Sequence, residues 1–349
     1  MADPRRTRWH GGPAGLGLLA VALISLSACS SGSHSSTAGS TTTTTSASAS
    51  SPTTTASGSG DTAVTGNLGI KVTGAFNSTP TLTFPGHGAP KQLTEQTLVA
   101  GSGSAIAAGD TAIVNYVGEI WPTTTGSQAK VFDSSFSRGT PAGFVIGTGA
   151  VIPGFDKTLV GKKLGSRVLL SIPPADGYGT SGNSQAGISG TDTLVFVVDL
   201  LSDYKPNASA PGVVDSQLPP TGWPKITNPP GREPTITSVT GVSAPTSPAS
   251  KLLVKGSGAS IDTKKTLVLQ LVQTDIATGK QTQATWGKQP QLVSAQNVLA
   301  IASALNGQSI GARAVVLLPA TAAQPASATA AAQPASPAEV LVIDVVGQF

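Results

Sequence analysis

The sequence predicts an α+β fold in which an antiparallel β-sheet curls as a half-barrel over one short α-helix, and it predicts two copies of that fold. Three observations support this. Strand-like alternation dominates between Gly69 and Leu201. Only one brief helical pattern, Pro153–Val160, interrupts it. Segments of this region also recur in the same order near the C-terminus, which is the signature of an internal repeat.

Five stretches carry the strand prediction, because apolar and polar residues alternate or β-formers cluster between turn residues. Gly69–Phe84 suggests one or two short strands leading into the domain. The others are Leu98–Gly103, which runs into a glycine turn, then Thr111–Ile120, Arg167–Ile172 and Thr193–Leu201. The many strands and single helix favour a sheet that packs one face on that helix.

The helix prediction rests on Pro153, since proline is tolerated at the first helical position, where its missing N–H would be unpaired anyway. Phe155, Leu159 and Val160 are expected to form one apolar face. Gly161 is expected to cap the C-terminal end.

The repeat places a second copy at residues 235–349. Thr97–Gly103 (TLVAGSG) recurs as Leu252–Gly258 (LLVKGSG), and Val195–Asp199 (VFVVD) recurs as Val340–Asp344 (VLVID). The first copy, with an N-terminal strand extension, is expected over residues 66–205. Between the copies, residues 206–234 are rich in proline and predict a semi-stiff linker, although Trp223 could instead pack on a neighbouring domain.

The first 65 residues predict export and tethering. Arg5, Arg6 and Arg8 precede an apolar run, Leu16–Leu26, that is too short to span a membrane as a mature helix. Leu26–Cys29 resembles the bacterial lipobox, so residues 1–28 are expected to be a lipoprotein signal peptide and Cys29 the lipidation site. The alternatives are an ordinary signal peptide with a chance cysteine, or twin-arginine export. Residues 29–65, mostly Ser, Thr, Ala and Gly, are expected to be a disordered tether. The expected location is the extracellular face of the membrane.

Composition restricts the chemistry. The 349 residues leave room for two domains with linkers, and the net charge is +4 without a basic stripe that carries interleaved aromatics, so nucleic acid is not an expected partner. The histidines stand at positions 10, 34 and 87, and Cys29 is the only cysteine. No intrachain disulfide, metal site, Ser/His/Asp triad or cofactor is therefore expected in the folded region.

Several short motifs follow one another in the first copy: Asn115–Gly118 (NYVG), Phe132–Ser135 (FDSS), Val151–Phe155 (VIPGF), Gly161–Arg167 (GKKLGSR), Tyr178–Gly179 and Thr193–Leu201 (TLVFVVDLL). Together they resemble the FKBP-type peptidyl-prolyl cis–trans isomerases over about 100 residues. The resemblance implies an FKBP-like fold, isomerisation of X-Pro bonds, and proline-containing polypeptides as partners, with macrolides as inhibitors of the family.

The resemblance also implies a site. Asp133 and Tyr178 would be the catalytic residues, with Tyr178 and the Ile152 N–H holding substrate carbonyls and Asp133 orienting neighbouring groups. Arg138 matches a position that pairs with the aspartate, and Ala142 replaces an aromatic wall residue, which leaves macrolide affinity open. The substrate-binding residues would be Tyr116, Phe132, Phe144, Val151, Ile152, Phe155, Ile188 and Phe196. Each apolar member could instead be core alone.

The chemistry suits such a site, because prolyl isomerisation breaks no bond and needs no base. Its barrier of about 18–20 kcal/mol reflects the loss of amide resonance on twisting, and a dry apolar pocket favours the less polar twisted amide.

In the second copy Leu271 replaces Tyr116, Thr282–Gln283 replaces Phe132–Asp133, and Ile301 replaces Phe155. That copy is expected to keep the fold and lack activity. The competing hypotheses are a non-catalytic module that binds proline-rich segments and, less favoured, an envelope scaffold.

Overall fold

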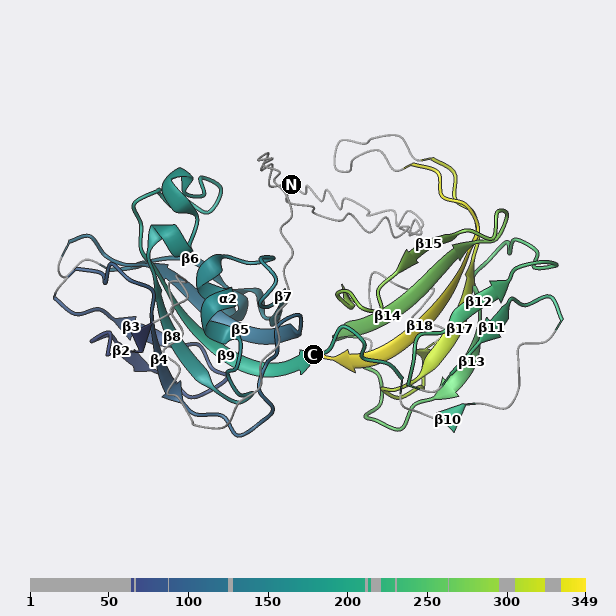
Figure 1. Cartoon of the computed structure of the whole chain (residues 1–349), viewed down its shortest axis with the longest axis horizontal. Helices are drawn as coiled ribbons and strands as arrows, with labels where there is room; N and C mark the ends of the chain where they lie inside the picture. Colours follow the sequence, from purple (N-terminus) through teal and green to yellow (C-terminus); the bar gives the residue numbers. More distant parts are fainter. Residues whose placement is uncertain are drawn as a thin grey trace, which may run out of the picture.

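The computed structural model of the 349-residue chain is shown in Figure 1. It describes residues 64–65, 67–86, 88–124, 128–210, 213–214, 221–229, 231–262, 264–294, 305–323 and 334–349. The predicted signal peptide, the predicted lipidation site Cys29 and most of the predicted tether lie outside the described residues. Within the described ranges, no helix is both long and apolar enough to cross a membrane.

The first sheet confirms the predicted antiparallel arrangement. Its strands run in the order β1-β4-β8-β9-β5-β6, with β7 also paired to β5. All of these pairs are antiparallel except the edge pair of β1 with β4. The strands are β1 (Val64–Thr65), β4 (Thr94–Val99), β5 (Thr111–Ile120), β6 (Lys130–Ser134), β7 (Ala142–Val145), β8 (Arg167–Ile172) and β9 (Leu194–Tyr204).

Helix α2 (Pro153–Leu159) covers one face of this sheet, as Figure 1 shows. Phe155 and Leu159 are buried against alternate strand residues that include Val168 and Phe196. The prediction for Val160 was wrong: its side chain is 40% exposed. The helix ends at Leu159, and Val160 turns to an extended conformation (φ −60°, ψ 131°), so its side chain leaves the apolar face.

The opposite face of the sheet, called here the outer face, is covered by the N-terminal extension. The hairpin β2 (Lys71–Thr73) and β3 (Thr81–Thr83) packs Val72 and Leu82 on the intervening strand residues, such as Val195 and Val197. The first sheet is therefore buried on both faces.

A buried ion pair fixes this extension to the sheet. Arg167 of β8 and Asp199 of β9 are 2% and 1% exposed, and the Arg167 Nε lies 2.6 Å from the Asp199 Oδ1. The guanidinium also donates to the carbonyls of Gly74 and Ser78, which lie between β2 and β3. A charge in an apolar interior is tolerated only when its hydrogen bonds are satisfied, so the loop of the hairpin is bound to this position.

The second sheet repeats the first, with the order β10-β13-β17-β18-β14-β15 and β16 paired to β14. The loop contacts repeat as well: Gly103 N donates to Leu164 O (3.0 Å), and Gly258 N donates to Ile310 O (2.9 Å). Its strands are β10 (Val213–Val214), β13 (Ala249–Lys255), β14 (Thr266–Asp275), β15 (Gln281–Ala284), β16 (Gln291–Ser294), β17 (Arg313–Leu318) and β18 (Glu339–Gln348).

Residues 206–234, in their described part, do not form the expected linker. The hairpin β11 (Lys225–Thr227) and β12 (Thr235–Ser238), with β11 inside this segment, covers the outer face of the second sheet, and Trp223 and Ile226 pack on it. In the described part of this segment, Pro224 and Pro229 flank β11, and the apolar Ile226 between them is packed on the sheet.

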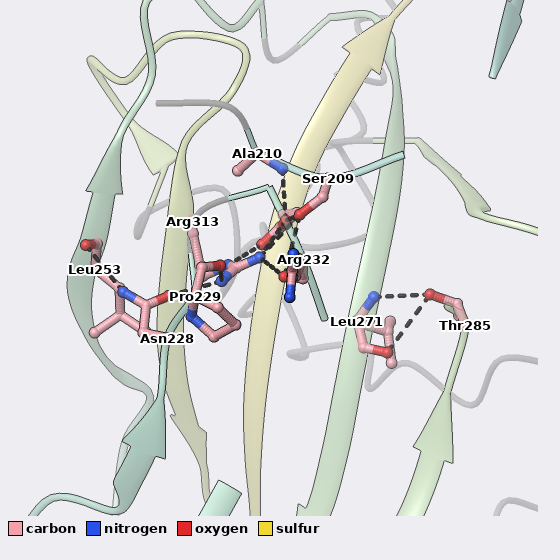
Figure 2. Close-up of polar contacts among 10 residues, drawn as sticks. Ser209, Ala210, Asn228, Pro229, Arg232, Leu253, Leu271, Thr285 and Arg313 are labelled. Atoms are coloured by element: carbon pink, nitrogen blue, oxygen red, sulfur yellow. Dashed lines mark hydrogen bonds and ion pairs between the residues drawn. The ribbon is translucent and has the colours of Figure 1, made fainter. Parts of the chain in front are cut away.

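The ion pair is repeated too, as Figure 2 shows for Arg313. Arg313 and Asp344 are fully buried, and the guanidinium contacts Asn228, Pro229 and Arg232 of the loop between β11 and β12. The repeating unit therefore includes an outer hairpin, and the second unit begins near residue 206 rather than at 235.

The two copies also contact each other. At the junction of the two copies, the carbonyl oxygen of Pro206 accepts hydrogen bonds from the Gln270 side chain (2.8 Å) and the Gly287 N–H (3.1 Å). Leu292 of β16 lies against Gly143 of β7, where a Cβ would come within 2.1 Å of it.

Candidate functional site

Five aromatic rings from five elements form one cluster above the inner face of the first sheet. Tyr116 comes from β5, Phe132 from β6, Phe144 from β7, Phe155 from α2 and Phe196 from β9. The ring centroids are 4.8 Å apart for Phe155–Phe196, 5.4 Å for Phe132–Phe196, 5.8 Å for Tyr116–Phe144 and Phe144–Phe155, and 6.1 Å for Tyr116–Phe196. The structure thus brings these five predicted residues together, although up to 80 positions separate them.

The five rings of the cluster differ in how far they are buried. Tyr116, Phe155 and Phe196 are 3–4% exposed, whereas Phe132 and Phe144 are partly buried and pack against them. The inner rings therefore serve as core, and the outer rings are available to an apolar ligand. The interpretation of these residues as core is confirmed, whereas their role in lining a substrate site stays a prediction.

Gly118 of β5 makes room for two of the rings, a role that was not predicted from the sequence. A Cβ at this position would lie 2.7 Å from Phe132 and 2.8 Å from Phe196, closer than carbon atoms approach. The last residue of the NYVG motif is therefore glycine because two phenyl rings cross the strand there.

A polar group closes one edge of the cluster. The Tyr116 hydroxyl donates a hydrogen bond to the Asp133 carboxylate, and Arg138 donates to both Asp133 and the Tyr116 oxygen, the latter at 2.9 Å. The Arg138 guanidinium also lies 5.5 Å from the Tyr116 ring centroid. The predicted Arg138–Asp133 pair is present. Because the Arg138 and Asp133 side chains are 48% and 40% exposed, water screens the attraction between their charges. The main effect of the pair is therefore to hold the two side chains in a fixed orientation.

This environment keeps Tyr116 protonated. Burial of the ring, aided by the hydrogen bond to Asp133 and partly opposed by Arg138, raises the pKa of Tyr116 to about 12. The phenol is therefore a hydrogen-bond donor at every physiological pH, and it fixes the Asp133 carboxylate in place.

Ser135 anchors the strand that carries Tyr116. Its Oγ accepts from the Tyr116 N–H (2.8 Å) and donates to the Asn115 side chain (2.8 Å). Ser134 caps the short helix α1 (Ser135–Arg138) by accepting from the Ser137 N–H. The two serines of the FDSS motif thus set the positions of Tyr116 and Arg138.

The segment before α2 supplies the predicted Val151 and Ile152. Both are partly buried and pack against the cluster. Asp156, which the sequence analysis missed, accepts hydrogen bonds from the Gly147 and Gly149 N–H groups at 2.7 and 2.5 Å. A carboxylate in the first turn of the helix thereby holds the loop that leads into it.

Ile188 and Tyr178 differ in their placement. Ile188 is 5% exposed, belongs to the same core, and is fixed by paired backbone hydrogen bonds with Asn183. Tyr178 is 38% exposed and makes no ring contact with the five-ring cluster in the described residues. It lies between two 3₁₀ turns, Pro174–Asp176 and Gly179–Ser181. Its role as a substrate contact stays a prediction.

Two further features bear on the site. Ala142 of β7 is partly buried at the margin of the same core, so the wall is formed by a methyl group where the family resemblance implied a ring. The Lys157 ammonium of α2 pairs with Asp176 at 2.8 Å, which ties the turn before Tyr178 to the helix.

Among the described residues, no three His, Cys, Asp or Glu side chains gather as metal ligands.

The second copy keeps the backbone anchor of this site and loses the rings. Leu271 pairs with Ile343 as Tyr116 pairs with Val198, and its N–H donates to the Thr285 Oγ1 (2.9 Å), as Figure 2 shows. The register also confirms Gln283 opposite Gln273, as Asp133 lies opposite Gly118. Leu341 takes the place of Phe196. The expected Ile301 lies outside the described residues.

Comparison with known proteins agrees with this geometry. A family model described as FKBP-type peptidyl-prolyl cis-trans isomerase matches residues 103–201. The FK506-binding protein of Streptomyces anulatus is 39% identical over 123 residues, which are 35% of this chain and 95% of that protein. FK506-binding protein 2 of Yarrowia lipolytica is 42% identical over 94 residues, 27% of this chain and 60% of the other.

The FkpA isomerase of Escherichia coli K12 is 38% identical over 125 residues, 34% of this chain and 43% of its own length. The crystal structure of FkpA from Escherichia coli covers 33% of this chain and 49% of that one, at 38% identity and a TM-score of 0.29. The chain thus spans nearly all of the Streptomyces protein and about half of FkpA. Because it covers nearly all of a relative that is 39% identical to it and matches the family model, this chain belongs to the FKBP-type peptidyl-prolyl cis–trans isomerase family.

Proposed function

We propose that the first copy catalyses cis–trans isomerisation of X-Pro bonds in exported polypeptides, by binding the prolyl segment against the five-ring cluster. The observation that carries this proposal is the convergence of Tyr116, Phe132, Phe144, Phe155 and Phe196 on one partly exposed apolar surface. Uncatalysed X-Pro isomerisation takes tens to hundreds of seconds, which is slow compared with most folding steps.

The energetic basis is a difference in solvation. Twisting the amide by about 90° removes its resonance and with it part of the charge on the carbonyl oxygen. Water therefore stabilises the planar form more than the twisted form. A surface of aromatic rings excludes water and binds the twisted form relatively better, and only such differential binding accelerates a reaction.

Each residue has a proposed task. Phe155, whose ring contacts those of Phe144 and Phe196, lies beneath the prolyl ring of the substrate. The Ile152 N–H, which makes no hydrogen bond to the described part of the chain, and the exposed Tyr178 hydroxyl hold the flanking carbonyls. Asp133, fixed by Tyr116 and Arg138, lies beside the twisting carbonyl. No proton transfer is needed.

The N-terminal sequence supports the proposed location on the outer side of the membrane. Acylation at Cys29 would hold the protein on the outer side of the membrane, with residues 29–65 as the tether, and polypeptides that emerge from export would be its substrates. Metabolic labelling with a fatty-acid analogue tests this: the parent chain should be labelled, and a Cys29→Ser chain should be released into the medium without label.

A protease-coupled prolyl-peptide assay on the full chain tests the activity. Asp133→Ala is expected to lower kcat/KM about tenfold or more, equivalent to about 1.4 kcal/mol of transition-state stabilisation. Tyr178→Phe is expected to have a smaller effect. Asp262→Ala, at an exposed position of the second copy, is the control and should match the parent.

A second function is favoured by one observation. Ala142 leaves the wall of the site lower than a ring would, and this suits a module that holds proline-rich segments without turnover. The same assay separates the two: turnover no faster than the uncatalysed rate, with peptide binding retained, would select the module. Ala142 also leads us to propose weak binding of macrolides, which titration with FK506 measures directly.

A further inference from the structure

A cavity lies on the outer side of the first sheet. Its volume is about 480 Å³, and it lies between β3 with the residues that follow it and the end of β5 with the residues that follow that strand. Glu119 of β5 pairs with Val195, whose side chain belongs to the outer face. The five-ring cluster belongs to the inner face, so this cavity is separate from the proposed isomerase site. The residues used below are Phe84, Glu119 and Trp121.

Glu119 is the unusual member of the lining. Its side chain is 8% exposed, and its carboxyl group makes no hydrogen bond or ion pair with the described part of the chain. Burial raises the pKa of this carboxyl above its ordinary 4.5. Buried carboxyl groups are normally paired, because an unpaired buried charge is costly. An acid left without a partner at a cavity wall calls for a partner from outside.

The second copy provides an internal comparison. A cavity of about 490 Å³ lies at the equivalent place, between β12 and the end of β14. Thr274 lies there opposite Val340, just as Glu119 lies opposite Val195, and Ile276 takes the place of Trp121. In the second copy the residue at this position is therefore neutral and buried (Thr274 is 3% exposed), so the fold can form the cavity without an acid there. The acid and the indole belong to the first copy alone.

We propose that the cavity of the first copy binds an organic cation, an ammonium or guanidinium group carried on an aliphatic stem, with Glu119 as its counter-ion. The rings of Phe84 and Trp121, 5.3 Å apart in an edge-to-face arrangement, supply apolar contact for the stem and attraction for the cation. The volume lies within the range of small-ligand sites, about 300–1,000 Å³.

A metal ion suits the cavity less well. Calcium takes six to eight oxygen ligands, usually with several carboxylates, whereas this cavity offers one carboxyl group with neutral threonine and glutamine oxygens. The cation could be the side chain of a lysine or arginine in a bound polypeptide, or a free diamine. Both share the chemistry that Glu119 recognises.

Isothermal titration of the full chain tests the proposal with three probes: Nα-acetyl-lysine methylamide, putrescine, and the neutral Nα-acetyl-norleucine methylamide. The first or second is expected to bind, and whichever binds more tightly identifies the source of the cation. The norleucine compound should bind at least tenfold more weakly. Glu119→Gln and Glu119→Thr should each weaken cation binding at least tenfold, whereas Glu233→Gln, which removes an exposed charge in the second unit, should change nothing.

Glu119→Thr introduces the residue that the second copy carries at this position, so it is expected to fold. A readout that needs no Glu119 variant is the NMR indole N–H signal of Trp121, assigned with Trp121→Phe. It should shift with the cation and not with norleucine. The proposal is overturned if neither cation binds, if norleucine binds as well as lysine, or if both Glu119 variants bind like the parent.

Discussion

At the scale of residues, two carboxyl groups near one end of the first sheet meet opposite conditions. Asp133 is partly exposed and accepts from the Tyr116 hydroxyl and the Arg138 guanidinium. Glu119 is buried and has only desolvation acting on its pKa. Asp133 of β6 and Glu119 of β5 are near neighbours in the strand pairing, yet one borders the inner cluster and the other lines the outer cavity. The face of the sheet on which each side chain lies therefore determines whether its carboxyl group is partly exposed and hydrogen-bonded, as in Asp133, or buried, as in Glu119.

Glu119→Gln is expected to stabilise the protein at neutral pH, by on the order of 1 kcal/mol, since it removes a charge buried without a partner. The folded pKa of this acid is raised, so its ionisation costs stability above that pKa. As the pH falls through it, the parent becomes protonated and the advantage of the variant should disappear. Thermal unfolding from pH 4 to pH 8 measures this; equal melting temperatures at pH 8 would contradict it.

At the scale of elements, β5 serves both faces because its side chains alternate. Tyr116 and Gly118 face the ring cluster, whereas Val117 and Glu119 face the outer layer. A ten-residue strand buried along most of its length thus carries residues of both candidate sites, and Gly118 and Glu119, one from each, are adjacent in the chain. Any change that shifted its register by one position would exchange the two faces.

Gly118→Ala is expected to lower isomerase activity at least tenfold while leaving the sheet folded. The new methyl group would lie within 3 Å of the Phe132 and Phe196 rings and would move the two rings of the cluster that cross β5. Activity and circular dichroism are measured together. Gly88→Ala is the control, since nothing lies within 4 Å of a Cβ there; equal losses in the two variants would show that the effect is not steric.

At the scale of the whole molecule, each unit holds its own outer hairpin through a buried Arg–Asp pair. Arg167 contacts the loop after β2, and Arg313 contacts the loop after β11. Breaking one partner of a buried pair leaves an uncompensated charge, which costs about 3–5 kcal/mol. The pairs are separate, so the two units are expected to lose stability separately.

Arg313→Met should therefore destabilise the second unit and spare the activity of the first. Limited proteolysis is expected to digest the region after residue 206 while a fragment that contains residues 66–205 persists and still isomerises prolyl peptides. Arg167→Met is the matched variant and should have the reverse outcome, with activity lost. Simultaneous digestion of both units in the Arg313 variant would contradict separate stabilities.

A fragment of residues 206–349 is expected to unfold cooperatively, whereas 235–349 should be much less stable, because it lacks Trp223 and Ile226 on the outer face of the second sheet. The longer fragment should show no isomerase activity, since Leu271 and Leu341 stand where the first copy has Tyr116 and Phe196. Acceleration of proline-limited refolding by this fragment would refute the claim.

Local patterns were sufficient for much of this fold. The limits of β5 and β8 and the start of α2 match the predicted ones, because alternation and a proline at the first helical position are read within a few residues. Motif order was sufficient to select the five ring residues. Val160 was misplaced because the helix ends one residue earlier than its periodicity suggested. Residues 206–234 were misjudged because prolines that flank short strands resemble prolines that stiffen a linker.

The sequence by itself determined the strands, the helix, the repeat and the family, since these depend on residue types at short spacing. Only the tertiary structure decided that the outer hairpins belong to the repeat, that Gly118 is required by two rings, and that Glu119, beside a cavity, has no partner among the residues that the structure describes. Those facts depend on which residues from distant segments come to share a volume, and packing in three dimensions alone fixes that.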